Sequence, residues 1–130
     1  MRVAEHLVTD RGFGVRVLST PSLIQIIERS AHEAIVPYLP EGSITVGYKI
    51  SLTHLAPTPE GQEVRVRVVV KEVQGRRIVF EVEAWDPVDK VAEGVHERYV
   101  LDGERYRERL ENKVRLLHER TEKSAGADPR

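Results

Sequence analysis

Residues 20–37 read TPSLIQIIERSAHEAIVP, and this segment carries the pattern of a central helix. Thr20 is a good N-cap and Pro21 a good first helical residue, because the hydroxyl accepts a free backbone N–H and proline has none to lose. The apolar residues recur at helical spacing over a broad face. The sequence therefore predicts a very apolar, buried helix. The helix is predicted to end near Tyr38, because three residues that disfavour a helix lie close to it: Pro37, Pro40 and Gly42.

Glu28 is the anomaly of this helix, because it shares an apolar line with Ile24 and Ile35. A carboxylate taken from water without a partner costs several kcal/mol. The Glu28 side chain must therefore extend to the solvent-exposed edge of the core, pair with a cation or a histidine, or stay protonated. Two interpretations stay open at this point: a catalytic carboxylate, or a structural pair with Arg76 or Arg98.

Four long strands are predicted after the helix. In the first, residues 44–54, the even-numbered residues are apolar and lie on one face, and His54 is the last residue on that face. The others cover residues 64–71, 77–84 and 91–101. Gln74-Gly75 predicts a tight hairpin between the second and third strands, and residues 86–89 predict a turn before the last. Gly94 marks a bulge or a close backbone approach in the last strand. Four strands joined by short turns imply an antiparallel meander.

The two ends of the chain carry weaker patterns. Residues 3–18 predict one or two short strands, broken at residues 10–12. After Asp102 a narrow apolar stripe predicts a surface helix ending near Glu119. We therefore expect one domain over residues 1–120 and a disordered tail over residues 121–130. The stripe consists of Tyr106, Leu110, Val114 and Leu117.

The expected fold class is α+β, with the central helix buried against one face of a long antiparallel sheet that curls round it. Such a small domain leaves a sheet edge open, and pairing two copies along that edge covers it. A homodimer is the natural expectation.

Composition narrows the function classes. The chain has 130 residues, with 20 basic and 21 acidic side chains, so its net charge is close to zero. The overall electrostatic field therefore does not favour binding to nucleic acid or to an anionic membrane. It has no cysteine, which excludes a disulfide framework and a thiolate nucleophile. The first residues show no signal-peptide pattern, and no apolar run is long enough to span a membrane. A cytoplasmic location is therefore expected.

His54 and Thr20 each have a purely structural interpretation. His54 can be a hydrogen-bonded histidine in the core or at its edge, and Thr20 can be the N-cap of the helix. However, a carboxylate on the central helix and an imidazole on the next strand could meet, with the carboxylate orienting and tuning a general base. Thr20 at the helix N-terminus could also position a water or a carbonyl. The pair of Glu28 and His54 is thus a stronger indication than either residue alone.

Other chemistries lack their motifs. The remaining histidines show no metal-ligand spacing with carboxylates, and the sequence has neither a phosphate-binding glycine loop nor a GxSxG elbow. These histidines are His6, His32, His96 and His118. The basic residues of the long hairpin are either a solvated sheet face or a contact for the phosphates of a nucleotide-tailed substrate. They are Arg65, Arg67, Lys71, Arg76 and Arg77.

Several motifs in this order resemble the hotdog-fold thioesterases of the fluoroacetyl-CoA thioesterase type. They are Ser19-Thr20-Pro21, Glu28, residues 46–61 (VGYKISLTHLAPTPEG), residues 74–77 (QGRR) and residues 94–98 (GVHER). The likeness runs from about Phe13 to Asp102. It implies a catalytic set of Thr20, Glu28 and His54, with Gly47 and Arg98 helping to bind or orient the thioester. It also implies a dimer of hotdog folds, with acyl-CoA entering at the subunit interface.

The main hypothesis is therefore acyl-CoA hydrolysis without a metal or a bound cofactor. Glu28 either tunes His54 as general base or attacks the thioester itself. Leu23, Ile24 and Ile27 near the glutamate are expected to contact the acyl group, whose identity the resemblance does not supply. The rivals are an acyl-CoA-binding sensor or assembly module and an enoyl-CoA hydratase. The hydratase is disfavoured because no aspartate lies near His54 in the sequence.

Overall fold

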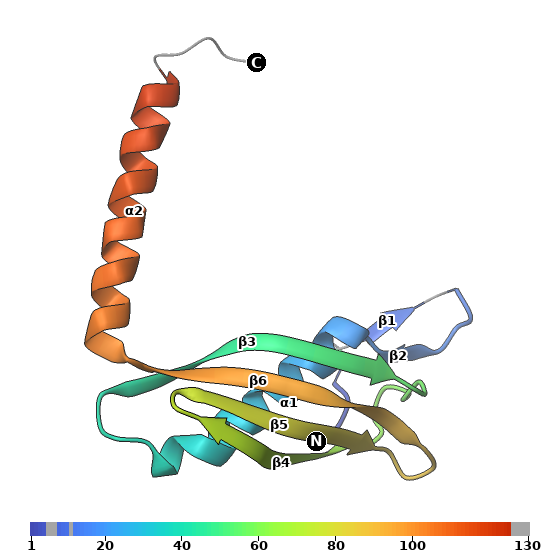
Figure 1. The fold of residues 1–130 in the computed structure, drawn as a ribbon. Coiled ribbons are helices and arrows are strands. Elements are labelled where there is room, and N and C mark those ends of the chain that lie inside the picture. The colour runs from blue at the N-terminus through green and yellow to red at the C-terminus, as the bar shows by residue number, and fades with distance from the viewer. Residues whose placement is uncertain (5–7, 11, 126–130) are drawn as a thin grey trace.

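The computed structural model describes residues 1–4, 8–10 and 12–125 of the chain. His6 lies outside these residues. Within the described residues, two helices, one short 3-10 turn and six strands follow one another (Figure 1). Their order is β1 (Val8–Asp10), β2 (Arg16–Leu18), α1 (Thr20–Ile35), the 3-10 turn η2 (Val36–Tyr38), β3 (Ser43–His54), β4 (Arg65–Gln74), β5 (Arg77–Trp85), β6 (Lys90–Asp102) and α2 (Gly103–Ala125).

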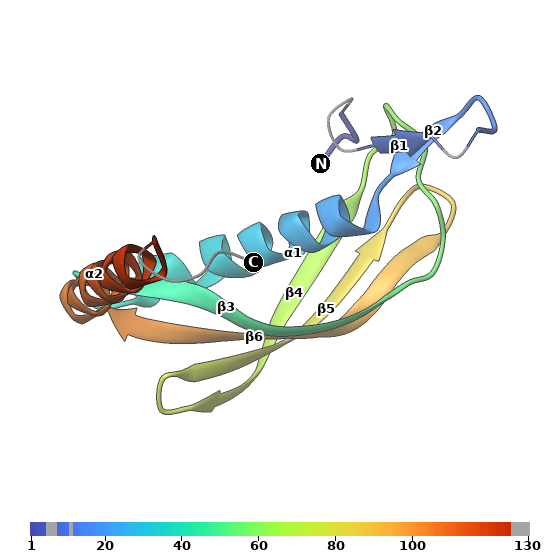
Figure 2. The same ribbon diagram turned by 90° about the horizontal axis from the view of Figure 1, so that it is seen from above.

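Helix α1 lies across one face of the four-stranded sheet, and the sheet curves round it (Figures 1 and 2). The core lies between these two layers. Its fully buried members include Leu23 and Ile27 of α1 and Phe80 and Val82 of β5. The predicted α+β architecture is confirmed. Residues 3–18 were predicted to hold one or two short strands, and the structure has β1 and β2 there, paired antiparallel.

The predicted meander is only partly correct. The strand order is β3-β6-β5-β4, so β4, β5 and β6 follow one another as neighbours while β3 pairs with β6. The reason is the connection over residues 55–64, which is not a tight hairpin turn and carries the chain from one edge of the sheet to the other. Consequently β3 and β4 are the two edge strands, and one side of each has no strand partner within the described chain.

A β-bulge in β3 corrects the predicted alternation. The register with β6 shifts between Gly47 and Lys49, leaving Tyr48 unpaired and 64% exposed. Such an extra residue exchanges the two faces of the strand beyond it. Ile50 therefore packs on the core as the even positions predicted, but before the bulge the odd residue Thr45 is the buried one.

Gly94 marks a close backbone approach rather than a bulge. The β3–β6 register is regular at this point, where Leu52 pairs with Gly94. A Cβ atom built on Gly94 would lie 2.0 Å from the carbonyl oxygen of Ser51. No side chain fits there unless the two strands separate.

Gly94→Ala is therefore expected to destabilise the protein by about 3 kcal/mol or more, at the upper end of overpacking effects, because the obstacle is backbone. Urea unfolding followed by circular dichroism measures the loss. Val95→Ala is the matched control in the same strand, since Val95 is 43% exposed. Its loss in the free energy of unfolding should be well under half of the loss caused by Gly94→Ala. Equal stability of Gly94→Ala and the wild type would contradict the close approach.

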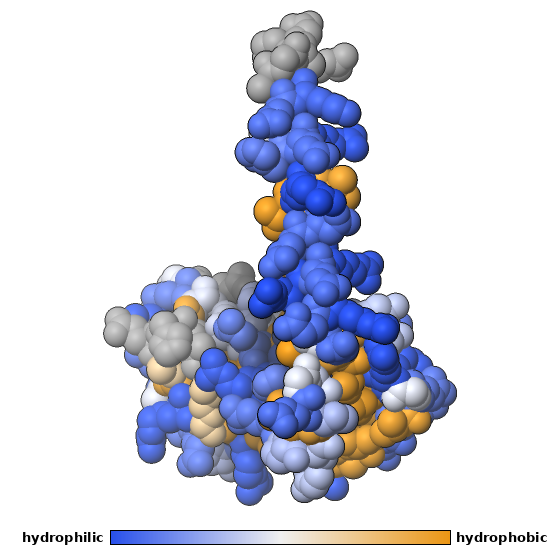
Figure 3. All heavy atoms as spheres, turned by 90° about the vertical axis from the view of Figure 1, so that its left-hand side faces the viewer, coloured by the Kyte–Doolittle hydropathy of each residue, from blue (hydrophilic) through white to orange (hydrophobic). Residues whose placement is uncertain are grey.

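Helix α2 stands away from the sheet and projects beyond the β3 edge (Figure 1). Its predicted apolar stripe is exposed, with Leu110 and Leu117 each about half accessible, and Figure 3 shows orange patches part-way along an otherwise hydrophilic helix. The helix extends past the predicted end to Ala125, through the first residues of the expected tail. The last turns are supported by His118–Glu122 at 3.2 Å. Residues 126–130 lie outside the described part. Neither described helix is long and apolar enough to cross a membrane.

Candidate active site

The N-terminus of α1 differs from its prediction in a way that matters for the site. Ser19, not Thr20, is the N-cap, because its side chain accepts a hydrogen bond from the Ser22 backbone N–H at 3.3 Å. The Ser19 hydroxyl also bonds the Ser22 hydroxyl at 2.8 Å. Thr20 is therefore the first helical residue, and its hydroxyl is not needed for capping.

The freed Thr20 hydroxyl meets His54, which ends β3. Thr20 Oγ1 and His54 Nδ1 are 2.7 Å apart, a short hydrogen bond. The other ring nitrogen, Nε2, is buried and has no hydrogen-bond partner among the described residues. Both side chains line a recess of about 280 Å³, which Leu55 and Pro57 border from the following loop. We call this pair the Thr20–His54 end of the site.

Glu28 lies elsewhere, half-buried beneath Gly47 of β3. A Cβ atom on Gly47 would lie 3.4 Å from Glu28 Oε1 and 3.5 Å from Arg98 Nη1. The missing side chain of Gly47 thus leaves a small space bordered by a carboxylate and a guanidinium. Arg98 interacts electrostatically with Glu28. Of the two candidate cations for Glu28, the structure therefore favours Arg98. We call this the Glu28–Gly47 end of the site.

Within one chain the two ends remain apart. Thr20 and Glu28 are separated by eight residues of α1, or about 12 Å along the helix axis. In the described chain, Glu28 and His54 make no hydrogen bond with each other. The expected meeting of these two side chains does not occur within a single subunit.

Arg98 is held by several hydrogen bonds on the inner face of the sheet. Its Nε donates to Thr45 Oγ1 at 2.6 Å, and its Nη2 donates to the Thr45 carbonyl at 3.2 Å. Nη1 lies 3.2 Å from His96 Nε2. Sequence reasoning missed Thr45 and His96. For His96 a signal was present, since it lies two residues before Arg98 and strand periodicity puts both on one face.

Burial lowers the pKa of His96 from its ordinary value of 6.5, and a hydrogen bond to the Lys49 carbonyl opposes this only in part. Burial also lowers the pKa of Arg98, while Glu28 acts in the opposite direction. His96 is therefore a neutral imidazole at pH 7, and Arg98 keeps its charge because its pKa starts so high.

This depressed pKa predicts how stability depends on pH. Between the native pKa of His96 and 6.5 the unfolded chain binds a proton that the folded chain does not. The contribution of neutral His96 to the free energy of unfolding is therefore present above pH 6.5 and is lost as the pH falls below that value. Urea unfolding between about pH 5 and 7.5 should show stability rising with pH, and His96→Gln should flatten that slope. An unchanged slope in His96→Gln would contradict the neutral, buried state.

The three apolar residues expected to contact the acyl group have different environments. Leu23 and Ile27 are fully buried in the core, so neither offers surface to a substrate within this subunit. Ile24, one turn before Glu28, is half-buried and remains a candidate. A recess of about 610 Å³ lies between α1 and β4, but none of the predicted site residues lines it.

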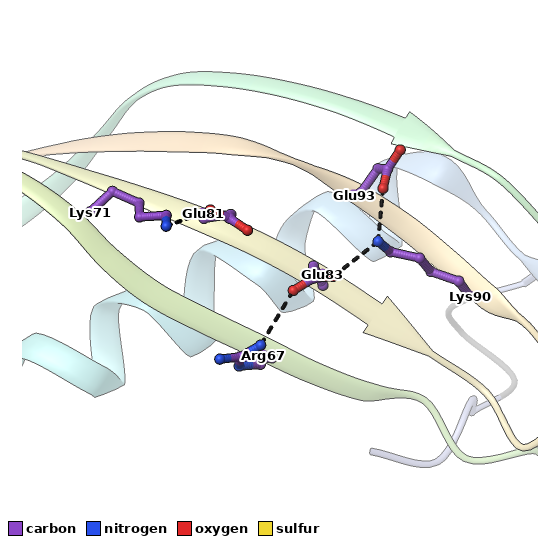
Figure 4. A network of polar contacts seen from close by, with 6 residues as sticks. All are labelled: Arg67, Lys71, Glu81, Glu83, Lys90 and Glu93. Carbon is purple, nitrogen blue, oxygen red and sulfur yellow. Dashed lines mark hydrogen bonds and ion pairs between the residues drawn. The ribbon is translucent and has the colours of Figure 1, made fainter.

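Most of the basic hairpin residues have acidic partners. On the outer face of the sheet Arg67 pairs with Glu83 at 3.6 Å and Lys71 pairs with Glu81 at 3.0 Å (Figure 4). Arg77 Nε donates to Glu97 at 2.6 Å. These pairs favour the interpretation as a solvated sheet face over phosphate binding. Among the described residues, no group of three or more histidines and carboxylates is arranged to hold a metal ion.

Residues 3–104 match the family described as fluoroacetyl-CoA-specific thioesterase. A fluoroacetyl-CoA thioesterase from Streptantibioticus cattleyicolor is 35% identical over 98 residues, which cover 75% of this chain and 70% of the relative.

The chain belongs to the fluoroacetyl-CoA-specific thioesterase family. It is therefore a thioester hydrolase, and solved structures of family members and other relatives agree with the hotdog fold. A mutant of the fluoroacetyl-CoA-specific thioesterase, in complex with fluoroacetate and CoA, has a TM-score of 0.80 at 30% identity, covering 87% of this chain and 94% of that one. A hot-dog-like protein from Thermanaerovibrio acidaminovorans has a TM-score of 0.80 at 28% identity, covering 87% and 85%.

Proposed function

We propose that this member of the thioesterase family hydrolyses an acyl-CoA thioester, with Thr20, Glu28 and His54 as the catalytic set. The observation that carries the proposal is the 2.7 Å bond between Thr20 Oγ1 and His54 Nδ1, beside a buried Nε2 with no partner in the described chain. A buried polar atom without a partner is costly and points to a function. The family relative solved with CoA supports an acyl-CoA as substrate.

The proposed site is completed by a second copy of the chain. Strand β3 is an edge strand and carries both ends of the site, with Gly47 near its middle and His54 at its end. Antiparallel pairing of two β3 strands about a two-fold axis places residues with a constant sum of numbers opposite each other. If the axis passes through the Ser51 pair, Ile50 lies opposite Leu52 of the partner subunit, and the extra residue at Tyr48 shifts the register so that Gly47 lies opposite His54 of the partner subunit. The Glu28–Gly47 end then faces the partner's Thr20–His54 end, which supports a homodimer with two shared sites.

In the proposed reaction His54 is the general base. When the Nδ1–H group donates a hydrogen bond to Thr20 Oγ1, the Nε2 lone pair is free to take a proton from water. The resulting hydroxide adds to the thioester carbonyl, the C–S bond breaks, and the imidazolium returns the proton to the CoA thiolate. The products are the free acid and CoA.

Glu28 stabilises the imidazolium that forms, or in the alternative route it attacks the carbonyl and forms an anhydride. Single-turnover hydrolysis in ¹⁸O water tests the anhydride route. Label in the Glu28 carboxylate would establish the anhydride. Label in the product acid alone would count against it, leaving direct attack by water or an anhydride opened at the substrate acyl carbon.

The experiment that tests the proposed function is CoA thiol release from short, medium, branched and aromatic acyl-CoAs, with fluoroacetyl-CoA included. Turnover of at least one member is expected, and the panel ranks the acyl groups. Acyl-CoA binding by calorimetry without turnover of any member would overturn the proposal in favour of a sensor or assembly module. Hydration of an enoyl-CoA without thiol release would favour the hydratase.

A further inference from the structure

His96 was set aside by the sequence analysis, but the structure encloses it completely. It has no exposed surface and stacks against Phe80, with ring centroids 6.1 Å apart and an interplanar angle of 23°. Its Nδ1 lies 3.0 Å from the Lys49 carbonyl oxygen. A carbonyl can only accept a hydrogen bond, so Nδ1 carries the proton.

The tautomer determines what the second nitrogen does. With the proton on Nδ1, the Nε2 lone pair faces Arg98 Nη1 at 3.2 Å and accepts a hydrogen bond from it. Protonation of the imidazole would instead turn an N–H toward the guanidinium. The charged groups acting on His96 are Arg98 and Glu97 of its own strand and Glu28 of α1.

A neutral acceptor has a specific advantage at this position. A carboxylate beside Arg98 would hold the guanidinium equally well but would cancel its charge. His96 and Thr45 instead take three N–H groups of Arg98 and add no charge. The full positive charge of Arg98 therefore remains for Glu28, across the small space under Gly47.

We propose that His96 is a positioning residue of this site: a neutral imidazole that accepts a hydrogen bond from Arg98 Nη1 and, together with Thr45, fixes the guanidinium beside Glu28. The inference rests on the proposed function, in which Glu28 belongs to the catalytic set. Neither His96 nor Thr45 contacts the substrate in this account.

Two substitutions distinguish the roles of the two ring nitrogens of His96. The amide of His96→Asn overlaps the Nδ1 position, so it can still donate to the Lys49 carbonyl but offers Arg98 no acceptor. The longer amide of His96→Gln reaches the Nε2 position and can present its oxygen to Arg98. His96→Asn is expected to lower kcat about 10- to 100-fold with KM within twofold, as is common when an orienting partner is lost. His96→Gln should keep kcat within about threefold of the wild type.

Controls separate positioning from folding. His118→Asn on the exposed face of α2 should leave kcat unchanged, since His118 is about three-quarters exposed. Urea unfolding of all variants shows whether a loss of kcat merely follows a loss of stability. Equal kcat in His96→Asn and His96→Gln, whether both normal or both reduced, would overturn the proposal.

An NMR measurement keeps the inference testable without turnover. In the wild type at pH 7, ¹⁵N shifts should show the Nδ1–H tautomer of His96, and rotation about the Arg98 Nε–Cζ bond should be slow. That rotation should become fast in His96→Asn and stay slow in His96→Gln. A protonated His96, or rapid rotation in the wild type, would overturn the positioning role. A wild type with slow rotation but no thiol release would instead count against the proposed function alone.

Discussion

His54→Ala is expected to lower kcat for acyl-CoA hydrolysis by about a thousandfold, within the range that general acid–base catalysis contributes. The reason is that His54 Nε2 is buried and has no hydrogen-bond partner in the described part of the chain, while Nδ1 is already held by Thr20 at 2.7 Å. Removing the ring deletes the base and leaves binding of the CoA portion largely intact. The loss should therefore appear in kcat, measured by thiol release with the best substrate of the panel.

His32→Ala is the matched control for this variant. His32 lies in the last turns of α1 and contributes no side chain to either end of the site. Its turnover should remain within about twofold of the wild type, as for most substitutions outside a functional site. A His54→Ala protein that keeps its full kcat would remove His54 from the mechanism.

Glu28→Gln is expected to lower kcat about 100-fold or more, because the amide keeps the shape of the side chain but loses the charge that stabilises the imidazolium. Arg98 keeps its three hydrogen bonds to Thr45 and His96, so the fold should survive. Thiol release and urea unfolding on the same preparation separate the two effects.

Glu33→Gln tests whether the loss is specific to position 28. Glu33 lies on the same helix but is exposed, and its neutralisation should change neither kcat nor stability beyond about 0.5 kcal/mol. If Glu28→Gln and Glu33→Gln have the same kcat, Glu28 is a structural counter-charge for Arg98 and not a catalytic residue.

The central layers of the fold could be predicted because their patterns are local. The apolar face of α1 and the alternation in β5 are periodic, and the tight hairpin at Gly75 shows the positive φ of 60° that its turn requires. The position of β3 beside β6 could not be read in this way. It depends on a long-range pairing that the loop of residues 55–64 permits but does not encode.

Some contacts of the candidate site could be predicted from the sequence, but its arrangement could not. The anomaly of Glu28 was visible in the helical periodicity, and the partner Arg98 was one of the two proposed. The competition between Ser19 and Thr20 for the N-cap position was not resolved from the sequence, because both are strongly preferred N-cap residues. The bulge at Tyr48 reverses the faces of β3, so Thr45 could not be recognised as an inward partner of Arg98 by alternation alone.

Subunit complementation tests whether the Thr20–His54 end of one copy works with the Glu28–Gly47 end of its partner. His54→Ala and Glu28→Gln chains, each nearly inactive alone, are unfolded together, refolded, and assayed by thiol release. A shared site predicts one intact site in every mixed dimer, and so a return to about a quarter of wild-type activity in a random mixture. Mixed dimers, isolated through a tag on each chain, with no more activity than the parents would contradict the shared site.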